Sequence, residues 1–226
     1  MRLSIAAQAR GRRAERNLTP AQAESARLYV HIGELLGEVG ARLAELDCVA
    51  FGCGPGSFTG VRLAATAAQA LGYGLGIRVC RRSSLAVLAA GALRSLRARR
   101  VAVCVDARMG RAYFGLYGPA GEGDVLALQP DALIVPDHLA LPPGPPCVAV
   151  GSGWAVWPQL TEHNSGQIAA LQTELLPSAS ELLNMAGADF ASDRLVSPEL
   201  ALPDYLAHGP VVARPQSHQE SDRNVP

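Results

Sequence analysis

Residues 48–76 constrain the fold of this chain more than any other stretch. They form an apolar run, a turn rich in glycine and proline, and an alanine-rich run in direct succession. Glycines allow backbone conformations that side chains forbid, and proline stiffens a turn. Ser57 or Thr59 can cap the helix that follows. We therefore expect a buried strand, a tight loop and a helix, an order typical of α/β proteins. The loop residues of interest are Gly54, Pro55, Gly56, Ser57, Thr59 and Gly60.

This glycine loop has two interpretations that its spacing leaves open. A helix that begins after a glycine turn exposes backbone N–H groups, which suit a phosphate or another chain's carboxylate. The loop nevertheless lacks the Gly-Lys-Ser/Thr ending of a P-loop, and all twenty basic residues of the chain are arginine. It also lacks the G-x-G-x-x-G spacing of a dinucleotide site. A purely structural strand-to-helix turn is the other interpretation.

The remaining pattern also predicts alternating strands and helices. Leu28, Ile32, Leu35 and Leu36 recur at helical spacing and would form one apolar stripe. The expected elements are a hairpin of Leu3–Ala9 with Arg12–Arg16, helices Pro20–Val39, Thr59–Gly72 and Ser84–Leu96 (capped by Ser83 or Ser84), and strands Asp47–Gly52, Ile77–Cys80, Val101–Val105 and Arg111–Tyr117.

An arginine-rich joint at residues 93–100 marks the expected boundary between two lobes. We expect a first lobe at 1–98 with the glycine loop and the helices Pro20–Val39 and Thr59–Gly72, a second lobe at 99–208, and a polar, disordered tail at 209–226.

Composition narrows the class of protein. The formal net charge is zero, which argues against a chain whose own surface grips a nucleic acid. Five cysteines without paired spacing suit a reducing cytoplasm, and the chain is expected to be cytoplasmic. No membrane span or signal peptide is expected, since arginines interrupt the N-terminal apolar run.

A catalytic constellation is not apparent in the sequence. The five histidines are dispersed, without a spacing that would place two metal ligands on one helix face. Asp106 and Arg108 flank a turn that they are expected to brace. Cys53 lies before a helix N-terminus that would lower its pKa, yet no histidine is near in sequence to act as its base. We therefore expect no catalytic residues and no metal site.

Two blocks carry a family resemblance. The first is GPGSFTGVR at Gly54–Arg62, followed by GLGIRVCRRSSLAVLA; the second is VAVCVDARMGRAYFGLYGPAG at Val101–Gly121. Weaker matches lie at Val148–Trp154, Leu176–Ala186 and Pro203–Leu206. These blocks resemble the TsaB family, the bacterial tRNA threonylcarbamoyladenosine biosynthesis protein. The resemblance implies a two-lobed α/β fold of the actin-like ATPase (ribonuclease-H-like) type.

The resemblance also implies a function. Members of the TsaB family resemble degenerate, non-catalytic relatives of TsaD. TsaD is the subunit that modifies the adenosine beside the anticodon of tRNAs that read codons starting with A. TsaB pairs with TsaD, the ATPase TsaE joins the assembly, and ATP or ADP binds near the shared interface. A homodimer is an alternative for the isolated chain, and tRNA would be reached only through the complex. The expected partner interface consists of Glu24, Arg27, Leu28, His31, Leu35, Arg62, Ala65, Ala68 and Gln69.

Two departures from the family pattern stand out. The opening strand, with its Asp-Thr loop, has no counterpart, because Leu3–Ala6 already aligns with the second family strand; a start codon assigned too far downstream would explain this. Arginine is also absent after Leu206. The alternatives to a partner subunit are an actin-like ATPase, phosphotransferase or peptidase, and a truncated interaction module without function.

Overall fold

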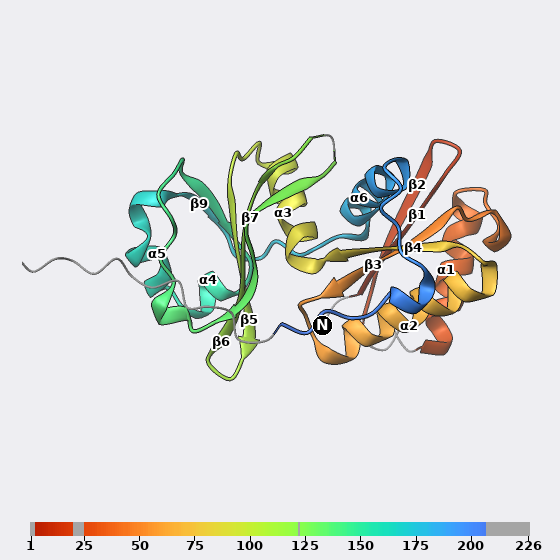
Figure 1. Cartoon of the computed structure of the whole chain (residues 1–226), viewed down its shortest axis with the longest axis horizontal. Helices are drawn as coiled ribbons and strands as arrows, with labels where there is room; N and C mark the ends of the chain where they lie inside the picture. Colours follow the sequence, from red (N-terminus) through yellow and green to blue (C-terminus); the bar gives the residue numbers. More distant parts are fainter. Residues whose placement is uncertain (1–2, 20–24, 122, 207–226) are drawn as a thin grey trace, which may run out of the picture.

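The computed structural model describes residues 3–19, 25–121 and 123–206, and these residues form two α/β lobes (Figure 1). The strands are β1 Leu3–Ala9, β2 Arg12–Leu18, β3 Cys48–Gly54, β4 Arg78–Ser83, β5 Val101–Arg108, β6 Arg111–Pro119, β7 Val125–Ile134, β8 Cys147–Val150 and β9 Ile168–Gln172. The α-helices are α1 Ser25–Glu38, α2 Phe58–Leu75, α3 Ser84–Ser95, α4 Gly153–Val156, α5 Gln159–His163 and α6 Ala179–Ala191. Short 3-10 helices lie at Leu43–Glu45, Pro136–His138, Ser165–Gln167 and Pro198–Leu200.

The predicted strand, loop and helix are present as β3 and α2. Ser57 is the N-cap, and its hydroxyl accepts a hydrogen bond from the Gly60 N–H at 3.2 Å. The helix ends at Gly76, whose φ of +66° is a left-handed conformation that glycine adopts without strain. It is longer at both ends than the expected 59–72, because Phe58 and Leu75 are also helical. The N-terminal hairpin is confirmed as β1 paired antiparallel with β2.

The strands of the first lobe form two separate two-stranded sheets. β1 pairs with β2, and β3 pairs in parallel with β4. α6 packs against β1, β3 and β4, so one helix covers both sheets. Within the described residues, neither β1 nor β3 has a second strand partner.

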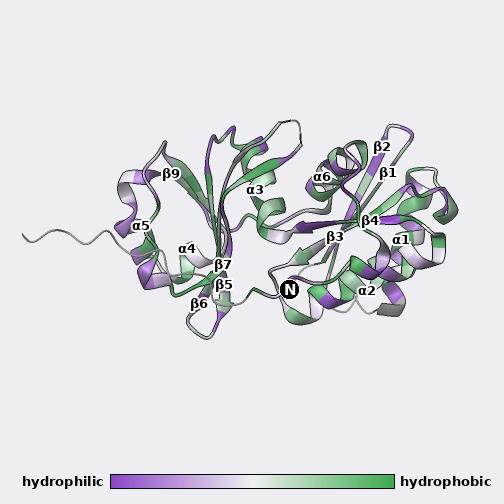
Figure 2. Cartoon of the chain, in the orientation of Figure 1, coloured by the Kyte–Doolittle hydropathy of each residue, from purple (hydrophilic) through white to green (hydrophobic). Residues whose placement is uncertain are grey.

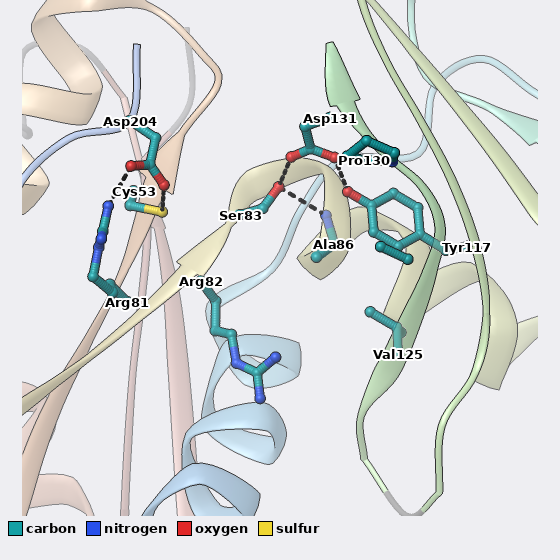
Figure 3. Close-up of a pocket in the computed structure, with 11 residues that line it drawn as sticks. Cys53, Arg81, Arg82, Ser83, Ala86, Tyr117, Val125, Pro130, Asp131 and Asp204 are labelled. Carbon is teal, nitrogen blue, oxygen red and sulfur yellow. Dashed lines mark hydrogen bonds and ion pairs between the residues drawn. The ribbon is translucent and has the colours of Figure 1, made fainter. Parts of the chain in front are cut away.

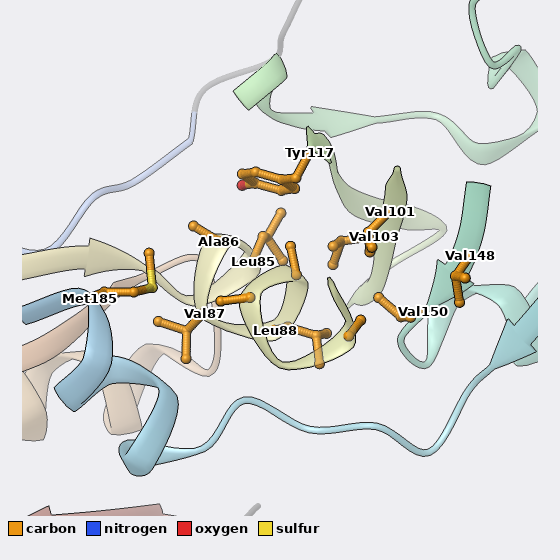
Figure 4. Close-up of a cluster of buried hydrophobic side chains, with 13 residues drawn as sticks. Leu85, Ala86, Val87, Leu88, Val101, Val103, Tyr117, Val148, Val150 and Met185 are labelled. Atoms are coloured by element: carbon orange, nitrogen blue, oxygen red, sulfur yellow. The ribbon is translucent and has the colours of Figure 1, made fainter. Parts of the chain in front are cut away.

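The second lobe contains a five-stranded sheet in the order β7-β6-β5-β8-β9. Successive side chains of a strand point to opposite faces of its sheet, and those of β5 pack into an apolar cluster on each face. Val101 and Val103 face α3, whereas Ala102 and Cys104 belong to the cluster that contains Trp154 of α4. Figure 4 shows the first of these clusters, in which α3 lies over the valines of β5 and β8. Helices thus cover both faces of this sheet.

Ser83 caps α3, as the sequence predicts. Its hydroxyl accepts hydrogen bonds from the N–H groups of Leu85 and Ala86 at 3.1 and 3.2 Å. Figure 2 shows α3 as largely hydrophobic along its length, in contrast to the hydrophilic strand β2. This helix is buried between the lobes because it contacts the second-lobe sheet and also α6.

We expected each lobe to be one continuous stretch of chain, at 1–98 and 99–208. The packing of the helices shows a different division. α3 precedes residue 98 but packs on β5 and β6 of the second lobe. α6 and the Pro198–Leu200 turn follow residue 99 but pack on the first lobe. Val196 also pairs with Val79 of β4. The boundary expected at 98/99 is corrected accordingly: the chain crosses between the lobes more than once. The tail at 209–226 lies outside the described residues.

Candidate functional site

The expected partner interface is split between the core and the surface. Leu28, Leu35, Ala65 and Ala68 are each 2–3% exposed, so they face the core. Ala65 and Ala68 pack with Phe51 of β3. The expectation that these two alanines belong to the partner interface is therefore wrong, because both are buried and their small side chains allow α2 to approach its sheet closely.

The other interface candidates are accessible. Arg27 and Arg62 are exposed, and His31 and Gln69 are half-buried. Glu24 lies outside the described residues. α1 and α2 share one apolar cluster through Leu28 and Ala67. The two helices therefore form a continuous layer on the first lobe, and their assignment as a partner surface stays a prediction.

Aromatic side chains on this layer were not anticipated from the sequence. Phe58 and Tyr73 of α2 are 60% and 61% exposed, and Tyr205 is 60% exposed. Arg62 lies 3.6 Å above the Phe58 ring centre and donates a hydrogen bond from Nε to the Tyr205 hydroxyl at 2.8 Å. Phe58, Arg62 and Tyr73 recur at spacings that place them on one helix face. That spacing was a signal available in the sequence.

The glycine loop is held by a segment from the far end of the described chain. The Asp204 N–H donates to the Cys53 carbonyl at 2.7 Å. A Cβ at Gly54, where φ is +108°, would lie 3.0 Å from the Asp204 carbonyl oxygen. Gly54 and Pro55 are buried, whereas Gly56, Ser57 and Thr59 are exposed. Close packing against residues 202–206 explains the glycine at 54. The loop's suitability for a phosphate or a carboxylate stays a prediction.

A pocket of about 400 Å³ lies between the lobes, beside this loop (Figure 3). On one wall Asp204 accepts a hydrogen bond from the Cys53 thiol at 3.1 Å and forms an ion pair with Arg81. Arg81 also donates to the Leu202 carbonyl at 3.1 Å. This wall therefore consists of residues that are far apart in sequence and already paired with one another.

The opposite wall contains a second carboxylate, Asp131 of β7. It accepts hydrogen bonds from the hydroxyls of Ser83 and Tyr117. Burial raises the pKa of the Asp131 carboxyl above its ordinary value, although these two hydrogen bonds act in the opposite direction. Burial and the neighbouring Asp131 charge raise the pKa of the Tyr117 phenol. Ser83 thus joins the two lobes, because it is the last residue of the first-lobe strand β4 and binds Asp131 of the second-lobe strand β7.

Cys53 is not an activated thiol. Burial is the main cause that raises its pKa to about 12, and the hydrogen bond to Asp204 adds to it. The pKa-lowering effect that we expected of a helix N-terminus is outweighed. A thiol with so high a pKa is almost entirely protonated near neutral pH, so it is a poor nucleophile.

The bracing role expected of Asp106 is confirmed. Its carboxylate accepts a hydrogen bond from the Arg108 N–H at 2.8 Å, and its own N–H donates to the Ser152 hydroxyl at 3.2 Å.

In the part of the chain that the structure describes, no three His, Cys, Asp or Glu side chains gather as metal ligands would. No helix of that part is long and apolar enough to cross a membrane.

A buried ion network was also not foreseen. Asp189 of α6 accepts hydrogen bonds from Arg82 at 2.6 Å and from Arg194 at 2.8 Å. The same two arginines bind Asp124, which precedes β7. Since Asp189 and Arg82 lie in the first lobe and Asp124 in the second, the network links the lobes. Asp189 and Arg194 are close in sequence, but Arg82 and Asp124 lie far from them and from each other, so no local pattern could have found the whole network.

Comparisons with known proteins place these features in a family. Residues 19–187 match the family model "TsaD: tRNA N6-adenosine threonylcarbamoyltransferase". The chain is 36% identical to the tRNA threonylcarbamoyladenosine biosynthesis protein TsaB of Escherichia coli, over 80% of this chain and 79% of that protein. It is 31% identical to the TsaB protein of Haemophilus influenzae, over 90% and 88% of the two chains.

A solved structure titled "YeaZ from Pseudomonas aeruginosa" is 36% identical, with a TM-score of 0.80, and the match covers 90% of this chain and 93% of that one. The expected fold, a two-lobed α/β fold of the actin-like type, is confirmed. Sequence and structure agree over most of both lobes, and the chain therefore belongs to the TsaB family.

Proposed function

We propose that this chain is a non-catalytic partner subunit in the formation of threonylcarbamoyladenosine in tRNA. Its direct partner is a TsaD-like catalytic subunit, and a TsaE-like ATPase joins the assembly with ATP or ADP at the shared interface. The observation that carries the proposal is the similarity to proteins named for this biosynthesis, which extends over most of the chain.

The interlobe pocket supports a partner role over a catalytic one. Hydrolysis or phosphoryl transfer needs groups that position a nucleophile and a charged leaving group. The two carboxylates of the pocket already serve intramolecular partners, Asp204 with Arg81 and Asp131 with Ser83. The Cys53 thiol is protonated for the reason given above. These residues would have to exchange their present partners before they could act on a substrate.

The residues on the outer face of α2 support the proposal that the partner binds there. Interfaces are enriched in exposed aromatic residues and arginine, which is the composition of this face. Phe58, Arg62 and Tyr73 are all exposed there. A homodimer through the same face is the competing arrangement for the isolated chain.

The test is co-purification of the chain with the TsaD-like protein of the same organism. Replacing Tyr73 with glutamate, or Arg62 with glutamate, is expected to weaken binding by about 30-fold, the effect of losing about 2 kcal/mol at a hot spot. Met109→Glu is the matched control, since Met109 is 97% exposed on a second-lobe turn. Circular dichroism checks that every variant is folded.

Two results would contradict the proposal. Equal binding by the wild-type chain and by both folded α2 variants would move the interface elsewhere, and failure of the wild-type chain to bind would refute the partner role.

The isolated chain is also expected to hydrolyse ATP no faster than background. Turnover that disappears in an Asp106→Asn variant would favour the enzyme alternative.

A further inference from the structure

Arg62 is the only charged residue of α2, and two aromatic side chains fix its position. Its guanidinium carbon lies 3.6 Å from the centre of the Phe58 ring and 5.7 Å from the centre of the Tyr205 ring. Its Nε donates a hydrogen bond to the Tyr205 hydroxyl at 2.8 Å. Stacking on Phe58 and the bond to Tyr205 together orient a side chain that is flexible by itself.

Tyr205 belongs to the last described segment of the chain and is itself held in place. The preceding residue, Asp204, donates its N–H to the Cys53 carbonyl at 2.7 Å and forms an ion pair with Arg81. The Tyr205 ring centre lies 6.2 Å from that of Phe58. Arg62 is therefore oriented by a residue that lies 143 positions away in the sequence.

The outer end of the Arg62 guanidinium is unpaired within the described residues. A guanidinium carries five N–H donors, and the hydrogen bond to Tyr205 uses only the one on Nε. The two Nη groups carry the other four, and such a fork matches the two oxygens of a carboxylate. α2 has no acidic residue, and Glu34 and Glu38 of α1 are already bound by Arg16. The two helices thus present an oriented cation whose counter-charge they do not supply.

The residues beside Arg62 indicate what kind of molecule carries that counter-charge. Five exposed residues recur at spacings of three or four positions and form one stripe along α2: Phe58, Arg62, Thr66, Ala70 and Tyr73. The stripe is about 22 Å long. Its small central residues let another helix approach closely, and its aromatic ends provide apolar contact area. A nucleic-acid site would need several cations, whereas this stripe has one.

We propose that Arg62 anchors one carboxylate, from an aspartate or a glutamate, on an otherwise apolar helix of the partner, and that Tyr205 is a positioning residue that holds the guanidinium ready for it. The inference rests on the proposed function, because the partner is the TsaD-like subunit. It adds the chemistry of the contact and a surface residue from outside α1 and α2. The partner gains a paired, charge-assisted contact with an arginine that is ordered before binding.

The test measures the dissociation constant of the full chain for the purified TsaD-like subunit by calorimetry. Arg62→Gln is expected to weaken binding at least about tenfold, the effect of losing hydrogen bonds to a charged group. Arg62→Lys keeps the charge but not the fork, so it should recover only part of that loss. Arg108→Gln is the matched control, since the Arg108 side chain is 86% exposed on a second-lobe turn. Circular dichroism checks that each variant is folded.

Two double-mutant cycles test the separate roles. Tyr205→Phe removes the hydroxyl and keeps the ring, so it should weaken binding about threefold in the wild-type chain and have no effect in the Arg62→Gln chain. The carboxylate is located by replacing each exposed Asp or Glu of the TsaD-like subunit with its amide. One such change should weaken wild-type binding at least about tenfold and lose its effect on Arg62→Gln.

The outcomes separate this inference from the proposed function. Wild-type binding that Arg62→Gln leaves unchanged would overturn the inference and leave the partner role standing, whereas absence of wild-type binding would refute both. Equal effects of Tyr205→Phe in the two backgrounds would overturn the positioning role. Binding of tRNA by the isolated chain that is lost in Arg62→Gln would assign Arg62 to phosphate, and self-association lost in the same variant would assign the carboxylate to a second copy; either result would overturn the proposal.

Discussion

The ion network between the lobes provides the sharpest test of the packing described above. Asp189 is 5% exposed at its side chain and receives both arms of Arg82, with Nε and Nη2 each at 2.6 Å from a carboxylate oxygen. Arg82 itself is only 19% exposed. Removing one partner of a buried ion pair costs about 3–5 kcal/mol, because the other charge is left without water or a counter-ion. Arg82 keeps Asp124, so the lower end applies.

We therefore expect Asp189→Asn to lower the free energy of unfolding by about 3 kcal/mol. In a chain of this size, such a loss corresponds to a melting temperature lower by about 6–12 °C. The matched control is Asp193→Asn, because Asp193 also pairs with an arginine, Arg78, but its side chain is 79% exposed. An exposed pair contributes about 0–1 kcal/mol. Urea unfolding followed by circular dichroism measures both variants.

The pH dependence of this difference follows from the Asp189 carboxyl. Burial alone would raise its pKa, but the hydrogen bonds from Arg82, Cys80 and Arg194 outweigh burial and hold the pKa below the ordinary value of 3.8. A carboxyl whose pKa is lower in the folded state stabilises the protein above its unfolded pKa and loses this contribution as the pH falls. The gap between the wild-type chain and Asp189→Asn should be constant from about pH 5 to 7 and shrink below about pH 4. Equal, small losses in Asp189→Asn and Asp193→Asn would refute the argument that the pair is desolvated.

Three further predictions concern individual side chains. Ala68→Glu should prevent folding at 37 °C, because it buries a charge at a position that is 2% exposed, and a folded variant by circular dichroism would contradict the core placement. Ser83→Ala should lower the free energy of unfolding by at least about 1 kcal/mol, because it removes both the α3 cap and the hydrogen bond to Asp131; Ser95→Ala, at the other end of α3, is the control, and equal effects would argue against these two roles. Cys53 should resist iodoacetamide at pH 8 in the folded chain and react once the chain is unfolded in urea, as followed by mass spectrometry, since its pKa is raised to about 12; rapid labelling of the native protein would contradict that value.

Local features of the structure were predictable from the sequence. The hairpin of β1 and β2, the succession of β3, loop and α2, and the Ser83 cap each depend on residues within a few positions of one another. Their physical causes are short-range: glycine conformations, capping hydroxyls and the period of apolar residues. The family resemblance rested on the same contiguous blocks, and the comparisons confirm it.

Orientation and long-range pairing were decided by the tertiary structure. An alanine-rich helix has small side chains on most faces, so its composition does not distinguish the face that meets a sheet from the face that meets a partner. The structure turns Ala65 and Ala68 inward and leaves Phe58 and Tyr73 exposed. The return of α6 to the first lobe, and with it the pairing of Asp189 with Arg82, depends on contacts between residues about a hundred positions apart. Such contacts form only when the whole chain is folded, and they leave no periodic signal in the sequence.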